Sequence, residues 1–492
     1  MQKALLAKDI QPIQYGIREI VQKGKQMEAA GFPVNWENIG DPVHKGMTMP
    51  QWMLEVIGRQ VGRSESFAYC DSKGTESTRT FLADKTNRLG GVQIGPEDIT
   101  FFNGLGDAIT TLYRLLSPGV KVIQPSPAYP AHTSAERLRL GAEPLTYACD
   151  PQRGWRPDVQ DLREKVRANP DVMAILVVNP DNPSGAVHAR EDLEAIVEVA
   201  REFDLVLIAD EIYEHVVFDG VMTRLAEVIG PDVCGIAMKG ISKEFPWPGA
   251  RCGWVEVYNR WCEASERVGF DAYCTRVDKT KMSEVCSTTL PQLVIPEIMQ
   301  DERYPALLAS RNEQYRQRME VLQAGLSGLE GWTISRGGGG FYAVITMDSS
   351  GTLASSSLDA LSMEADVSLL MSPERRALFE GWRTDAKTDA EMDAKTNAEK
   401  YAETDAEPSS ERKGLLTDYL LTDHLLTDYL LAGFGICAVP LSAFNSPHIG
   451  FRITLLEADE VVFEEMVSRL KEALASYQPK KLGSTMRLSM LV

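Results

Sequence analysis

The sequence predicts an α/β protein in which helices cover a mostly parallel sheet, and two kinds of segment carry this prediction. Continuous apolar runs rich in β-branched residues, VMAILVVNP (172–180) and LVLIADEIY (205–213), are typical of strands buried on both faces. Between them, AREDLEAIVEVAREF (189–203) has the pattern of an amphipathic helix. Sheets of this kind bind ligands beyond the carboxyl ends of their strands, so polar residues at those ends are the candidates for function.

The composition is that of an ordinary globular protein. The chain has 492 residues, enough for two or three domains, with 44% hydrophobic and 25% charged residues. The net charge of −19 argues against nucleic-acid binding, which needs a basic surface. Eight cysteines without a C-x-x-C pair indicate reduced thiols in a cytoplasmic protein; metal ligation is the alternative, but no Cys/His cluster has ligand spacing. We expect neither a signal peptide nor a membrane span.

The other strands and helices follow in order along the chain. DITFFN (98–103) and VKVIQPSP (120–127) predict strands, and a long polar helix pattern over 302–329 leads into RGGGGFYAVITM (336–347). A smaller α/β unit resumes near Gly433 and ends in a helix. We therefore predict an N-terminal arm with part of the small domain (1–45), a large domain (46–300) and a small C-terminal domain (301–492).

Two repetitive tracts interrupt the small domain. Residues 384–407 form six tetrapeptides with alanine in the third place, and they lie in a low-complexity insertion at about 350–414. Alternating charges at i, i+4 would support a solvated helix, but the tract has no apolar face, which favours a mobile insertion. In 415–431 the unit LLTD[YH] repeats every five residues. On a helix, a step of five residues rotates the side chains by about 140°, so the leucine pairs do not share one face. The repeat looks like a duplicated helix start, of which one copy would be enough.

Four segments that follow predicted strands have the residues to bind a small molecule. They are NGLGDA (103–108), NPDNPSG (179–185), ADEIYEH (209–215) and GISKEFPWPGARCGW (240–254). In the first, glycines before a helix expose backbone N–H groups that can cradle a phosphate. In the last, Lys243 and Arg251 suit an amine nucleophile beside a phosphate-binding cation.

Each segment also has a structural interpretation. NGLGDA could be a plain tight turn, Asp210 could cap a helix, and Lys243 and Arg251 could be unrelated surface cations. Arg452, in the strand-like GFRITLL, could pair with an acid of the following helix such as Glu457 or Asp459.

Taken together, the four segments resemble the class I and II aminotransferases of pyridoxal-phosphate (PLP) fold type I. The resemblance extends to YCDSKGTESTRTFL (69–82) and GFRITLL (450–456), and covers nearly the whole chain apart from about 350–430. QYGIREI (14–20) followed by NIGDP (38–42) is similar to the opening of alanine-aminotransferase-like members. The resemblance implies a large domain with a mostly parallel seven-stranded sheet between helices, a smaller α/β domain, and a homodimer with shared active sites.

The resemblance also implies a role for each matching residue. Lys243 would hold PLP as a Schiff base and move the proton at the substrate Cα, and Asp210 would pair with the pyridine nitrogen. Arg452 would bind the substrate α-carboxylate in a pocket lined by Gly40 and Asn182. The remaining cofactor contacts would come from the backbone of Leu105 and Gly106 and from the side chains of Tyr69 of the neighbouring subunit, Tyr129, Asn182, Tyr213, Ser242 and Arg251.

The chain departs from the family at two places. Gly240 stands where the family often has a serine that binds the phosphate, and the two repetitive tracts interrupt the small domain. Amino transfer between an L-amino acid and a 2-oxo acid is the leading interpretation. The resemblance of the opening around Tyr15 and Arg18 to alanine-aminotransferase-like members implies small 2-oxo acids with glutamate. A β-lyase, decarboxylase or cyclase reaction on the same scaffold is the alternative. A PLP-sensing regulator would need a DNA-binding extension, and a catalytically inactive scaffold does not fit the full set of residues.

Overall fold

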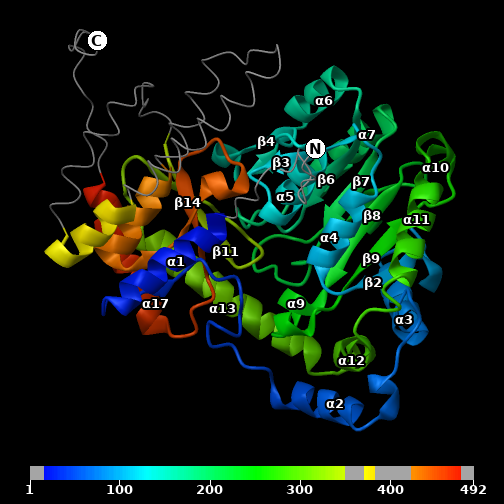
Figure 1. Cartoon of the computed structure of the whole chain (residues 1–492), viewed down its shortest axis with the longest axis horizontal. Helices are drawn as coiled ribbons and strands as arrows, with labels where there is room; N and C mark the ends of the chain where they lie inside the picture. The colour runs from blue at the N-terminus through cyan, green and yellow to red at the C-terminus, as the bar shows by residue number, and fades with distance from the viewer. Residues whose placement is uncertain (1–15, 349–370, 383–422, 478–492) are drawn as a thin grey trace, which may run out of the picture.

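A computed structural model of the chain describes residues 16–348, 371–382 and 423–477 (Figure 1). Its largest sheet has eight strands in the order β2-β9-β8-β7-β6-β3-β4-β5. The strands β3, β4, β6, β7 and β8 pair in parallel, whereas β9 runs antiparallel to both of its neighbours. The bounds are β2 Ile99–Phe102, β3 Lys121–Ser126, β4 Thr146–Asp150, β5 Arg156–Pro157, β6 Val172–Val178, β7 Val206–Asp210, β8 Gly235–Gly240 and β9 Gly253–Tyr258.

The predicted α/β class and mostly parallel sheet are confirmed. The eighth strand, beyond the expected seven, is β5, a two-residue edge strand antiparallel to β4. A strand this short carries too little pattern to be recognised in the sequence.

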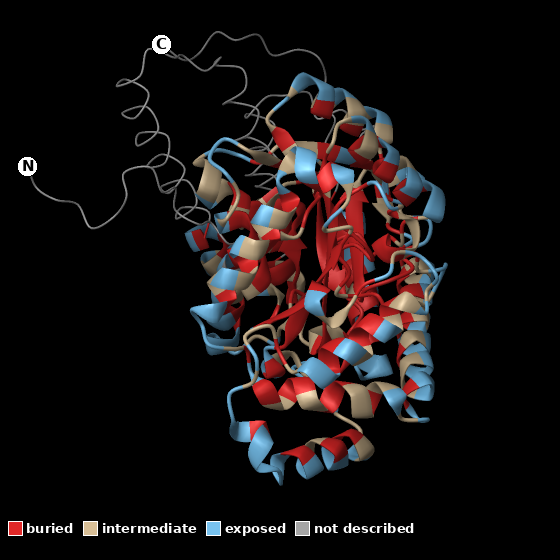
Figure 2. Ribbon diagram, turned by 90° about the vertical axis from the view of Figure 1, so that its right-hand side faces the viewer, coloured by how far each residue is buried: buried red, intermediate tan, exposed pale blue. Residues whose placement is uncertain are grey.

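The continuous apolar run of β6 is explained by two cores, one on each face of the sheet. Ile175 and Val177 pack in one core with α7 (Arg190–Glu202), whereas Leu176 and Val178 pack in the other with α4 (Leu105–Arg114). Successive side chains of a strand point to opposite faces, so a strand covered on both sides must be apolar throughout. Figure 2 shows the buried strands inside and the surrounding helices with exposed outer faces.

A second sheet lies beside the first, on the left in Figure 1. Its order is β10-β11-β14-β13, all antiparallel. The helices that share its apolar core include α1, α13 and α17, which bring the N-terminal and C-terminal segments together. The bounds are β10 Trp332–Ile334, β11 Tyr342–Met347, β13 Val439–Pro440, β14 Gly450–Thr454, α1 Gly16–Ala29, α13 Tyr304–Gly325 and α17 Glu460–Ser476. The division of the chain at residues 45 and 300 stays a prediction.

Of the two repetitive tracts, the tetrapeptides lie outside the described residues, as does the first part of the leucine repeat. The last copy belongs to a helix over 423–434, in which Leu426, Tyr429 and Leu430 are buried. These residues pack in the apolar core of the small sheet together with α1, α13 and α17. Within the described ranges, no helix has the length and apolar character to traverse a bilayer.

Candidate active site

All four predicted segments leave the large sheet at the same edge, since Phe102 at the end of β2 pairs with Gly253, which also pairs with Gly240 at the end of β8. Val178 pairs with Asp210, and Asp210 with Met238, so β6, β7 and β8 end side by side. Asn182 follows β6, Tyr213 follows β7, and Lys243 lies on α9 (Ile241–Glu244), directly after β8. The topology alone therefore brings the predicted residues to one edge of the sheet.

Asp210 is buried and its carboxylate is paired with a histidine. Its Oδ2 lies 3.1 Å from His132 Nε2, and both side chains are at most 3% exposed. His132 Nδ1 lies 3.3 Å from the hydroxyl of Tyr113, which fixes the ring from its other side. Asp210 Oδ1 accepts from the N–H of Ile212, but that segment is a turn and not a helix, so the helix-cap interpretation is wrong. His132 was missed by sequence analysis; its one signal was its place three residues after Tyr129.

Lys243 and Arg452 are linked through one short backbone segment. Lys243 Nζ donates to the carbonyl of Gly40 at 2.7 Å, and Arg452 Nη2 donates to the carbonyl of Asn38 at 2.8 Å. Gly40 has to be a glycine, because a Cβ there would overlap the hydroxyl of Tyr342. Two residues of the NIGDP motif thus contact both of the groups that the resemblance assigns to catalysis and substrate binding.

Arg452 is buried without a carboxylate partner in the described part of the chain. Its Nη1 donates to Asn182 Oδ1 at 3.1 Å, its guanidinium stacks 4.2 Å from the Tyr342 ring centre, and its Nε has no hydrogen-bond partner among the described residues. The alternative pairing is wrong, because Glu457 binds Lys45 at 3.2 Å and Asp459 caps α17. A buried arginine without an anion is costly, so this one is suited to receive an anionic ligand.

The glycine-rich loop faces the second predicted cation. Gly104, with φ of 82°, directly precedes α4, so the N–H groups of Leu105 and Gly106 lie at the helix N-terminus. A Cβ on Gly104 would lie 2.5 Å from Arg251 Nη2, which places the guanidinium against the loop. Backbone donors, a helix N-terminus and an arginine together suit a phosphate.

The other predicted cofactor contacts are Tyr129, Tyr213, Ser242 and Tyr69. Tyr129 caps α5 (Pro130–Leu140) and meets His132 edge-on, with ring centres 6.3 Å apart. The hydroxyl of Tyr213 donates to that of Tyr342 at 3.1 Å, and burial raises the pKa of Tyr213 well above its usual value. Ser242 is half-buried on α9. Tyr69 is 83% exposed, so it belongs to the surface of this chain.

The departure at Gly240 has a packing explanation. A Cβ there would lie 3.0 Å from the carbonyl oxygen of Cys252 and from Cα of Gly253 in the adjacent strand β9. A serine would therefore push β8 and β9 apart at the residues that lead into α9. This close strand contact is consistent with glycine at the position.

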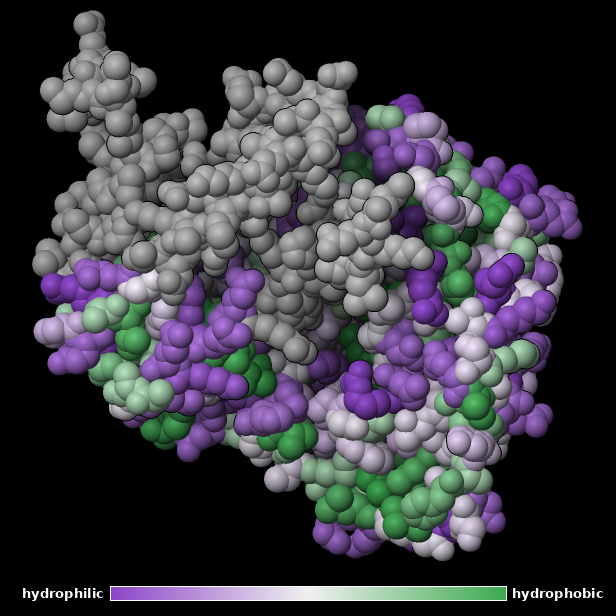
Figure 3. Space-filling view, in the orientation of Figure 1, coloured by the Kyte–Doolittle hydropathy of each residue, from purple (hydrophilic) through white to green (hydrophobic). Residues whose placement is uncertain are grey.

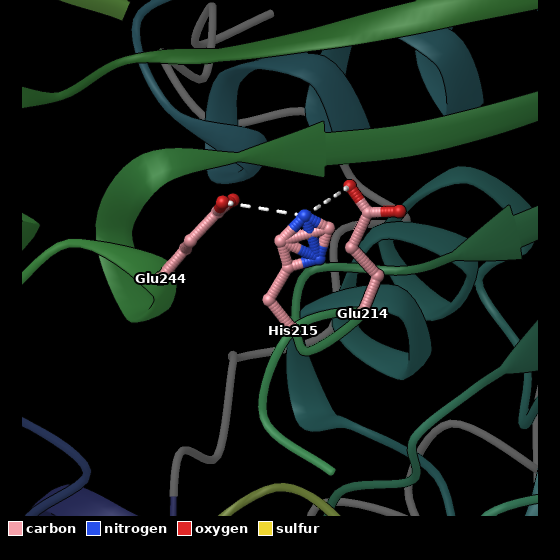
Figure 4. Close-up of side chains that lie close together, drawn as sticks. All are labelled: Glu214, His215 and Glu244. Atoms are coloured by element: carbon pink, nitrogen blue, oxygen red, sulfur yellow. Dashed lines mark ion pairs between the residues drawn. The ribbon is translucent and has the colours of Figure 1, made fainter. Parts of the chain in front are cut away.

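A buried cluster of charged side chains lies behind α9. Figure 4 shows His215 between Glu214 and Glu244, an arrangement that could hold a metal ion. Lys85, however, already supplies a cation there: its Nζ lies 3.3 Å from Glu214 Oε1 and 3.1 Å from His215 Nε2. An ammonium group cannot accept a hydrogen bond, so His215 Nε2 must be the acceptor and the ring is neutral. Within this cluster Glu214 is paired with Lys85, whereas Glu244 Oε1 has no hydrogen-bond partner among the described residues.

The neutral state of His215 predicts a pH dependence of stability. Burial is the main cause that lowers the pKa of His215 from 6.5 to about 3. Below about pH 6.5 the unfolded chain binds a proton that the folded protein excludes, so stability is lost as the pH falls. Between about pH 7.5 and about pH 5.5, the stability advantage of the wild type over His215→Gln should shrink by roughly 1.4 kcal/mol. Denaturant unfolding at both pH values measures it, and a pH-independent difference would contradict a neutral His215.

Comparison with known proteins identifies the family. The model of the family aminotransferase class I and II matches residues 38–470. The chain belongs to this family, whose enzymes use pyridoxal phosphate and transfer amino groups between amino acids and 2-oxo acids.

Relatives and solved structures agree with this assignment. An uncharacterized aminotransferase of Methanocaldococcus jannaschii is 40% identical over 94% of this chain and 96% of its own length. A glutamate-pyruvate aminotransferase of Escherichia coli is 34% identical over 49% of this chain and 59% of its own. Among solved structures, an alanine aminotransferase from Pyrococcus furiosus matches with a TM-score of 0.74 at 22% identity, covering 95% of this chain and 99% of that one. An aspartate aminotransferase from Thermus thermophilus with maleate matches with a TM-score of 0.67 at 21% identity, covering 96% of this chain and all of that one (100%).

Proposed function

We propose that this aminotransferase moves the amino group between glutamate and a small 2-oxo acid such as pyruvate, with Lys243 holding the cofactor. The observation that carries the proposal is the buried Arg452, which has no anion among the described residues and is linked to Lys243 through the carbonyls of Asn38 and Gly40. An α-carboxylate held by Arg452 would bring the substrate Cα toward the lysine amine. The relatives named as glutamate-pyruvate and alanine aminotransferases support the choice of substrates.

The residues of the site fit pyridoxal phosphate. The N-terminus of α4 and Arg251 form a cradle for a phosphate, in which a Cβ on Gly104 would collide with the guanidinium. Asp210, held by His132, is a buried carboxylate that can pair with a protonated pyridine nitrogen. When bound, the cofactor supplies the carbonyl that takes up the amino group and the electron sink that stabilises charge at Cα.

The chain's own residues then hold the reacting groups and move the proton. Lys243 Nζ would move the proton from the substrate Cα to C4′ of the cofactor, while Arg452 would orient the carboxylate with two parallel hydrogen bonds. Tyr213 and Asn182 would hydrogen-bond the phenolic oxygen of the cofactor, and Tyr129 would cover its ring. Leu105, Gly106, Ser242 and Arg251 are the proposed phosphate contacts.

We also propose a homodimer in which Tyr69 completes the site of the partner subunit. Tyr69 and Phe67 are 83% and 72% exposed, beside α2 (Gln51–Val61), where Leu54 and Val61 are exposed as well. Figure 3 shows apolar side chains gathered on this part of the surface, at the bottom of the view. Large exposed apolar patches mark interaction sites.

The absence of disulfides among the eight described cysteines supports the proposed cytoplasmic location.

Half-reactions with single amino acids test the proposal. The protein loaded with pyridoxal phosphate should convert it to the amine form with glutamate or alanine, releasing one 2-oxo acid per site. Release of ammonia or carbon dioxide instead would favour a lyase or decarboxylase reaction.

Substitution of the carboxylate-binding arginine predicts a specific loss. Arg452→Lys should raise KM for both amino acid and oxo acid, because lysine cannot form the bidentate pair. The expected loss in kcat/KM is roughly 2–4 kcal/mol, while the cofactor absorbance stays normal. Arg267→Lys, at an exposed arginine paired with Asp204, is the matched control. Steady-state kinetics that leave both KM values unchanged would assign Arg452 a structural role.

A further inference from the structure

Helix α13 carries two buried arginines seven residues apart. One holds the backbone carbonyls of Lys243 and the next residue, and the other holds carbonyls five and six residues after Arg452. Arg311 Nη1 donates to the carbonyls of Lys243, at 3.3 Å, and of Glu244. Arg318 Nε and Nη2 donate to the carbonyls of Glu457 and Ala458, both at 3.1 Å. Seven residues make two helical turns, so both side chains lie on one face, about 10 Å apart along the axis.

The contact of Arg311 matters because α9 is only four residues long. The last carbonyls of a helix have no partner within the helix, and a one-turn helix has no further turns to restrain it. Arg311 satisfies two of these carbonyls directly at Lys243 and Glu244, and its side chain is 4% exposed. The backbone that carries the Lys243 side chain is thereby fixed to α13.

Arg318 is connected to the surroundings of Arg452 through a series of hydrogen bonds and ion pairs. Glu457, whose carbonyl Arg318 holds, binds Lys45 at 3.2 Å, and Lys45 binds Glu37 at 3.0 Å. Glu37 accepts a hydrogen bond from Thr454, two residues after Arg452. It also directly precedes Asn38, whose carbonyl accepts from Arg452.

We propose that Arg311 and Arg318 are positioning residues that set the distance between Lys243 Nζ and the Arg452 guanidinium. One link between those two groups runs through the carbonyls of Gly40 and Asn38, and the second runs through the rigid helix α13. The second link fixes how far the substrate Cα lies from the lysine once the carboxylate is bound. This inference rests on the roles proposed above for Lys243 and Arg452.

Inhibition by propionate, a short carboxylate that cannot react, measures the effect of Arg318 on Arg452. Arg318→Met keeps an unbranched apolar stem but removes both hydrogen bonds, together with the guanidinium that lies over Phe463 and pairs with Glu460. It should raise the propionate inhibition constant and the KM for the amino acid about tenfold and lower kcat, since displacements near 1 Å cost up to about 10²-fold. The pH midpoint of the cofactor absorbance should stay unchanged. Arg318→Lys, which keeps one donor, should recover part of the loss.

Arg311→Lys should give the opposite pattern. It should move the pH midpoint of the cofactor absorbance by roughly half a unit and lower kcat, with the propionate inhibition constant unchanged. Arg316→Met is the control, because Arg316 lies on the same helix, has a side chain that is 41% exposed and pairs only with Glu313 and Glu320 among the described residues.

Folded Arg318 variants with wild-type inhibition constants and KM would overturn the proposal, as would an Arg311→Lys variant with an unchanged midpoint. If Arg318→Met does not fold, the proposal is tested by the inhibition constant and KM of Arg318→Lys and by the absorbance midpoint of Arg311→Lys. If Arg452→Lys also binds substrate normally, the proposed function fails and the inference fails with it. If Arg452→Lys is impaired and the Arg318 variants are normal, the inference alone fails.

Discussion

Lys243→Ala should lose the covalent link to the cofactor and reduce turnover by more than about 10⁴-fold. No other lysine is in a position to replace it among the described residues that surround the site: Lys45 is held by Glu37 and Glu457, and Lys239 lies among Glu211, Glu214 and Glu256. The variant should therefore lack both the group that forms the Schiff base and the base that moves the Cα proton.

The measurement combines an absorbance spectrum of the variant with single-turnover kinetics. Lys279→Ala, at an exposed lysine on α11 (Phe270–Met282), is the matched control and should retain both the spectrum and the activity. An active Lys243→Ala variant would remove the basis of the proposed mechanism.

Asp210→Ala should lower the rate at least about 10³-fold, a loss of several kcal/mol in transition-state stabilisation. The substitution removes the buried carboxylate 3.1 Å from His132 and, with it, the negative charge that would keep the pyridine nitrogen protonated. Asp210→Asn tests the charge separately, because it keeps the shape and one hydrogen-bond acceptor.

Asp192→Ala is a suitable control for a general loss of stability, since Asp192, on α7, pairs with Arg156 of β5 and not with the site. The pre-steady-state rate of the half-reaction is compared between Asp210→Ala, Asp192→Ala and the wild type. A loss below tenfold for Asp210→Ala would mean that its role is structural.

Much of the fold was predictable because its signals are local. The strands over 172–178 and 206–210, the helix over 190–202 and the order of the four segments follow from hydrophobic pattern and turn residues along the chain. Once these strands are parallel neighbours, the topology brings Asn182, Asp210 and Lys243 to one edge. The family resemblance then supplied the roles, which the pattern alone could not.

What the sequence could not provide were the partners that hold these residues. His132, Tyr342 and the arginines of α13 act through contacts across long stretches of chain, for which spacing gives no signal. The same limitation left the structural alternatives for Asp210 and Arg452 open. They were decided by which groups are close in space: His132 beside Asp210, and Lys45 in contact with Glu457.

The most direct test of amino transfer at this site is a two-step absorbance titration of the protein loaded with pyridoxal phosphate. Glutamate should abolish the visible band of the Lys243 Schiff base and release one equivalent of 2-oxoglutarate per site. Pyruvate, added after removal of glutamate, should restore the band and yield one equivalent of alanine. A band that glutamate and alanine leave unchanged, or that pyruvate does not restore, would contradict amino transfer between these substrates.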